Sequence, residues 1–81
     1  SSASITFSQT VQAIEGFDDS ELSEDDKDAL LGMLSRLETA NEKKDPSAKE
    51  KAAKVIKWLG DKSTDVIVAV APVVMKSMLG Q

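Results

Sequence analysis

Charged side chains are the residues of this 81-residue chain that could do chemistry, and the two signs occupy different segments. Residues 15–28 hold eight carboxylates and a single lysine, whereas residues 43–62 hold seven lysines and three acids. Two interpretations stay open. The segments form solvated faces that attract each other weakly across the fold, or they bind head to tail between copies, which predicts association that salt dissolves.

The acidic run 18-DDSELSEDDKD-28 suggests calcium at first sight. An EF-hand loop needs glycine at its sixth position and glutamate at its twelfth. The sixth position is Ser23 when counting starts at Asp18, and it is Glu24 when counting starts at Asp19. Neither register fits, so we predict no metal site and no cofactor.

Catalysis also lacks its usual residues. The chain has no histidine and no cysteine, which removes the commonest general base and the thiolate nucleophile. Its four glycines are scattered and form no phosphate-binding loop. We therefore predict that the protein is not an enzyme.

The lysines at 49, 51, 54 and 57 could contact nucleic-acid phosphates. Glu50 interrupts them, the net charge of the chain is −4, and its one arginine, Arg36, lies in another segment. Nucleic-acid binding through this segment is a lesser alternative.

Apolar spacing predicts four helices that position these charges. Phe7, Val11 and Ile14 fall on one helical face of a first helix, which Ser4 or Thr6 caps and Gly16 ends. A second helix covers 23–42, with Ser23 as N-cap and a leucine stripe to bury. A third covers 45–60, because Asp45 followed by Pro46 is a strong start signal.

The last segment is the most apolar. From Val66 to Met75 no side chain carries charge or hydrogen-bonding groups, and Pro72 lies inside the run. Its β-branched residues favour a strand, but a lone strand would have no pairing partner. We predict a helix over 65–79, too short and interrupted by Lys76 to span a membrane.

These elements predict an all-α fold, a small four-helix bundle or orthogonal array with the apolar C-terminal helix at its centre. Residues 1–81 form a single domain, and the opening 1-SSAS-4 without methionine is as expected of a piece excised from a longer protein. The predicted core consists of Phe7, Val11, Ile14, Leu30, Leu34, Leu37, Val55, Ile56, Leu59, Val66, Val70 and Val73.

The last helix has more apolar surface than three short helices can cover. At 100° per residue, Val66, Ile67, Val70, Val73 and Val74 form one face, and Val68, Met75 and Leu79 lie nearly opposite, with Lys76 at a solvent-tolerant edge. Three interpretations stay open: a fully enclosed helix in a monomer, association with another copy or protein, and membrane insertion of this helix. Trp58 is either an edge-of-core residue covered by lysine stems or an interface anchor.

Two stretches resemble a known family. The order 22-LSEDDKDALL-31, then 54-KVIKWLGDK-62, then a small-residue apolar tail to Gly80 is similar to a C-terminal helical module of bacterial abortive-infection, AbiTii-like proteins. The resemblance covers roughly Glu15 to Gly80. It implies a bacterial, cytoplasmic accessory domain of a larger, defence-related protein and supplies no catalytic residue.

We therefore expect a non-enzymatic protein–protein interaction or oligomerisation module, most simply a homo-oligomer. Its interface residues would be Trp58, Val68, Met75 and Leu79. The alternatives are a membrane-active protein that uses its C-terminal helix and nucleic-acid binding through the third helix.

Overall fold

The computed structural model describes the backbone of residues 2–80 and the side chains of residues 6–80. This part of the chain contains four α-helices and no strand. The helices are α1 (Ser2–Glu15), α2 (Glu24–Glu42), α3 (Ala48–Trp58) and α4 (Thr64–Met78), and the 3₁₀ helix η1 (Leu59–Asp61) joins the last two. The predicted all-α fold is confirmed, and the apolar segment is a helix.

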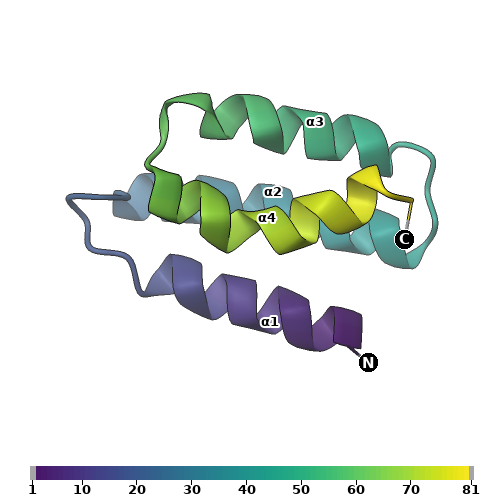
Figure 1. The fold of residues 1–81 in the computed structure, drawn as a ribbon, viewed down its shortest axis with the longest axis horizontal. Helices are drawn as coiled ribbons and strands as arrows, with labels where there is room; N and C mark the ends of the chain where they lie inside the picture. The colour runs from purple at the N-terminus through teal and green to yellow at the C-terminus, as the bar shows by residue number, and fades with distance from the viewer. Residues whose placement is uncertain (1, 81) are drawn as a thin grey trace.

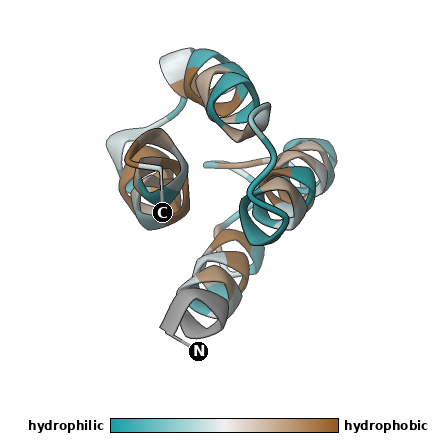
Figure 2. Cartoon of the chain, turned by 90° about the vertical axis from the view of Figure 1, so that its right-hand side faces the viewer, coloured by the Kyte–Doolittle hydropathy of each residue, from teal (hydrophilic) through white to brown (hydrophobic). Residues whose placement is uncertain are grey.

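The four helices surround a shared core. In Figure 1, α4 lies in front of α2, with α3 on one side of it and α1 on the other. The view along the helices in Figure 2 shows α4 and α2 on opposite sides of the core. α4 contacts all three other helices, but one side of it faces outward, so it is not enclosed at the centre of the fold.

The core consists largely of the residues predicted for it, and the prediction was wrong for Ile56. Ile14, Leu30, Leu34, Leu37, Val55, Leu59, Val66, Val70 and Val73 are buried, Phe7 and Val11 are partly buried, and Leu22 and Ala52 are further core residues. Ile56 was predicted to be buried but is 47% exposed. It follows Val55 by 100° on α3, which turns it away from the core and toward solvent beside α4.

The helix starts follow the capping rules with two corrections. The Ser23 and Ser63 hydroxyls accept hydrogen bonds from the third residue beyond each, at 3.1 and 3.3 Å. α3 begins at Ala48 rather than at Pro46, because the Asp45 carboxylate accepts from the Ser47 amide at 2.9 Å and forms a separate turn. α1 begins at Ser2, so Ser4 and Thr6 lie inside it and are not its cap.

Lys27 joins the acidic segment to the end of α1. Its ammonium donates to the Phe17 carbonyl and to Glu24 Oε2 at 2.9 Å, and it lies 3.6 Å from Asp19 Oδ1. The hydrogen bond to Glu24 is the main reason that the pKa of Lys27 is raised. The acidic run is therefore organised around its own lysine, and the described residues contain no cluster of three carboxylates able to hold a metal ion.

Candidate interaction surface

Beyond the first turn, which carries the exposed residues Thr64 and Asp65, the side of α4 that faces away from the core is apolar. We call Ile67, Val68, Ala71, Met75, Met78 and Leu79 the outer face of α4. Five of its members are large side chains that are between 40% and 68% exposed, and among the described residues Ile56 is the one other large apolar side chain exposed to this degree. The exposed apolar surface of the described chain is thus concentrated on α4 and the adjoining edge of α3.

The opposite side of α4 makes the packing contacts. Val66, Val70 and Val73 are fully buried, and Val74 and Ser77 are nearly so. These residues recur every three or four positions and so lie on one side of the helix. Ile67 was predicted to share their face, but it is 40% exposed because it lies 100° from Val66, at the edge of the buried arc.

A groove runs between α3 and α4 next to the outer face. Its volume is about 400 Å³, and its lining is almost entirely carbon. The lining residues are Ile56, Leu59, Gly60, Ile67, Ala71, Val74 and Met75. No atom lies within 4 Å of the position that a Cβ on Gly60 would occupy, so the groove is open at this end.

Lys76, the lysine of α4, is held off the outer face. Its ammonium donates to Glu38 Oε1 on α2 at 2.7 Å, and the two side chains are only 16% and 9% exposed. One turn along, the Asn41 amide donates to the Ser77 hydroxyl at 2.6 Å. Lys76 was predicted at a solvent-tolerant edge; instead it faces α2, so the exposed charged side chain of α4 is Asp65 in its first turn.

Trp58 lies apart from this surface. It is partly buried against the core, and the Lys62 ammonium lies 4.6 Å from the centroid of its ring. Lys62 also pairs with Asp61 at 3.3 Å and with Asp26 of α2 at 3.4 Å, and the hydrogen bond to Asp61 is the main reason that its pKa is raised. Trp58 does not line the groove, so the structure brings together Val68, Met75 and Leu79 but not the fourth predicted interface residue.

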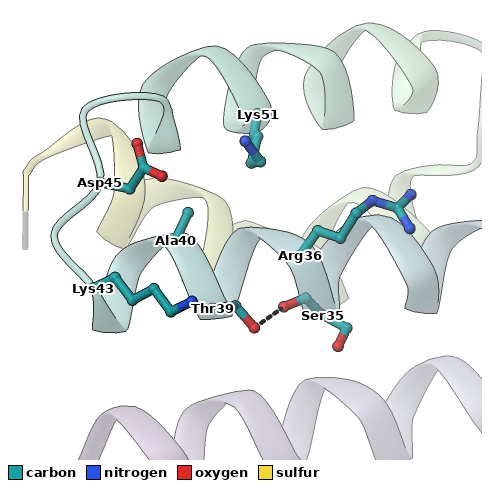
Figure 3. Close-up of a pocket in the computed structure, with 7 residues that line it drawn as sticks. All are labelled: Ser35, Arg36, Thr39, Ala40, Lys43, Asp45 and Lys51. Atoms are coloured by element: carbon teal, nitrogen blue, oxygen red, sulfur yellow. Dashed lines mark hydrogen bonds between the residues drawn. The ribbon is translucent and has the colours of Figure 1, made fainter.

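A smaller hollow is lined mainly by polar residues and is wide open to solvent. It lies between α2 and the turn before α3, has a volume of about 270 Å³, and is drawn in Figure 3. Thr39 Oγ1 donates to the Ser35 carbonyl at 3.0 Å, and the Lys51 ammonium donates to Ser47 Oγ at 2.8 Å. Asp45 there has a lowered pKa, chiefly because its carboxylate accepts the Ser47 backbone hydrogen bond. The Thr39 hydroxyl, the Lys51 ammonium and the Asp45 carboxylate are thus each engaged in a local hydrogen bond.

Sequence reasoning missed Ile56, Ile67 and Met78 as members of the exposed apolar surface. Ile56 was predicted in the core and Ile67 on the face of the last helix that includes Val66, because each lies next to a buried residue; Met78 was assigned to neither face. The usable signal is angular: at 100° per residue, each lies about 70–100° from the centre of the buried arc of its own helix, at the edge of that arc or beyond it.

Comparison with known proteins identifies no relative. No protein-family model matches the chain, and no curated protein and no solved structure is significantly similar to it.

Proposed function

We propose that this protein is a non-enzymatic interaction module that self-associates through the outer face of α4. The observation that carries the proposal is the set of exposed apolar side chains on α4, which is continuous with an apolar groove and has one exposed charged neighbour on the helix, Asp65 in the first turn. Contiguous apolar patches that stay exposed on a small soluble domain mark sites of interaction.

The energetics favour a partner that covers the whole face at once. Covering a half-exposed aliphatic side chain contributes about 1 kcal/mol, whereas association costs roughly 4–15 kcal/mol. One or two contacts are therefore insufficient. In a two-fold symmetric dimer each contact occurs twice, so the five large residues of the outer face together with Ile56 supply about a dozen contributions.

The charged segments support an apolar rather than an ionic interface. Lys27 pairs within the acidic run, Lys54 pairs with Glu50 at 3.7 Å, and Lys51 bonds to Ser47. Among the described residues, Lys62 and Asp26 form the ion pair that connects the two segments. Part of the charge needed for head-to-tail binding or for contacts to nucleic acid is thus engaged within the chain.

Sedimentation velocity over a concentration series, at low and at high salt, tests the proposal. We expect a dimer or larger species whose dissociation constant is nearly independent of salt. Association that is lost at high salt would instead indicate an ionic interface between residues 15–28 of one copy and residues 43–62 of another. A monomer at all concentrations would overturn self-association.

A membrane surface is the second candidate for the same face. No helix of the described chain is long and apolar enough to cross a membrane. However, an apolar face flanked by lysines, here Lys49 and Lys57 on α3, can lie in a lipid interface. Co-sedimentation with anionic vesicles would support this alternative. That the module belongs to a larger bacterial cytoplasmic protein is a proposal that rests on the sequence resemblance.

A further inference from the structure

The outer face of α4 carries a ridge and a groove side by side. We call Val68, Met75 and Leu79 the ridge; they are the most exposed members of the face, at 63%, 57% and 68%. The groove lies on the α3 side of this ridge, and Met75 belongs to both. A surface with a projection next to a matching depression can be complementary to itself.

The dimensions of ridge and groove agree. An apolar cavity of about 150 Å³ holds one benzene-sized group. The groove, at about 400 Å³, therefore has room for two or three aliphatic side chains. The ridge offers three: Val68 and Met75 lie along the part of α4 that lines the groove, from Ile67 to Met75, and Leu79 lies one turn beyond it.

We propose that two copies pair with their α4 helices side by side and parallel, the ridge of each copy lying in the groove of the other; this arrangement rests on the proposed function. The symmetry follows from the positions. A two-fold axis across α4 would place ridge on ridge and groove on groove. A two-fold axis along α4 exchanges the two features, so both ridges enter grooves at once.

The flanking charges favour the same axis. α3 and α1 lie on opposite sides of α4 (Figure 1). On α3, Lys49 and Lys57 are exposed, and Lys49 lines a hollow that reaches Ser77 and Gly80 at the end of α4. An axis across α4 would make the two α3 helices antiparallel neighbours and set the lysines of one copy against those of the other, Lys49 toward Lys57. The axis along α4 instead sets α3 against α1 of the second copy, whose exposed residues from 8 to 13 carry no charge.

Single-cysteine cross-linking tests the arrangement, because the chain has no cysteine of its own. The variants are Val68→Cys and Leu79→Cys, with Ala29→Cys on α2 as the control for random collisions. In the parallel pair each residue lies at the same height as its copy, so both ridge variants form same-site disulfides at least tenfold faster than the control. Val68 and Leu79 are separated by about 16 Å along the helix, beyond disulfide reach.

A one-to-one mixture of the two ridge variants completes the test. Mixed Val68–Leu79 links that exceed the same-site links would mean antiparallel helices and would overturn the arrangement. Sedimentation of the reduced variants tests self-association independently of the parallel packing. A dimer with mixed links leaves self-association standing and removes only the parallel packing, whereas a monomer with control-level links removes both.

Discussion

Val68→Asp is expected to abolish self-association and to leave the monomer folded. Val68 is 63% exposed and lies on the ridge of α4. Aspartate and valine have similar helix propensities, and substitutions at exposed sites usually change the free energy of unfolding by about 0.5 kcal/mol. The monomer should therefore keep its helical signal and its melting temperature within a few degrees.

The dimer should be far more sensitive. Full burial of a valine side chain contributes about 1.5–3 kcal/mol, so covering the exposed part of Val68 contributes about 1–2 kcal/mol per copy. A symmetric dimer loses this twice, and each new carboxylate must also lose water without a partner. A total of about 3 kcal/mol or more corresponds to at least a 100-fold weaker dimer.

Analytical ultracentrifugation of the variant at the concentration where the wild type is dimeric measures the effect. Ala29→Asp is the matched control, since it adds the same charge at an exposed position on α2. We expect the control to dimerise like the wild type. If both variants weakened the dimer equally, net charge and not the outer face would govern association, and the assignment would be refuted.

Three further outcomes follow from packing and charge within one copy. Glu38→Ala should lower the free energy of unfolding by about 3 kcal/mol, because it leaves the mostly buried Lys76 ammonium unpaired, whereas Lys76→Met should cost far less; equal losses in urea titrations would argue against this. The pKa of Lys27 is raised in the folded protein, chiefly by its hydrogen bond to Glu24. The charged ammonium therefore contributes fully to folding stability below its unfolded pKa, near 10.5, and this contribution is lost as pH rises through the folded pKa. The melting temperatures of wild type and Lys27→Met should accordingly converge only above the folded pKa of Lys27. Ile14→Ala should cost about 2–5 kcal/mol in the same urea titrations, since the side chain is fully buried; a loss below 1 kcal/mol would place α1 outside the core.

Much of the fold could be predicted because it depends on local spacing. The buried residues of α4 recur at three- and four-residue intervals, and Ser63 precedes the helix in the position that caps its first turn. Angular position on one helix also placed Val68, Met75 and Leu79 on a common exposed side. Such features require no knowledge of the neighbouring helices.

The groove could not be predicted, because it depends on how two helices pack. Ile56 and Ile67 lie at the border between the buried and the exposed side of their helices, where burial depends on how closely α3 and α4 pack. Lys76 looked solvent-exposed until its partner was known, and Glu38 is 38 residues away in the chain. Lysine stems were expected over Trp58, but which lysine covers its ring depends on η1, which brings Lys62 to it.

Methionine oxidation at increasing protein concentration tests the central claim most directly. Met75 and Met78 lie on the outer face of α4 and are 57% and 44% exposed, whereas Met33 packs against the core from α2 and serves as an internal reference. We predict that the oxidation rates of Met75 and Met78 fall as the protein associates while the rate of Met33 stays constant. Unchanged rates at Met75 and Met78 under conditions where the protein is dimeric would show that a different surface forms the interface.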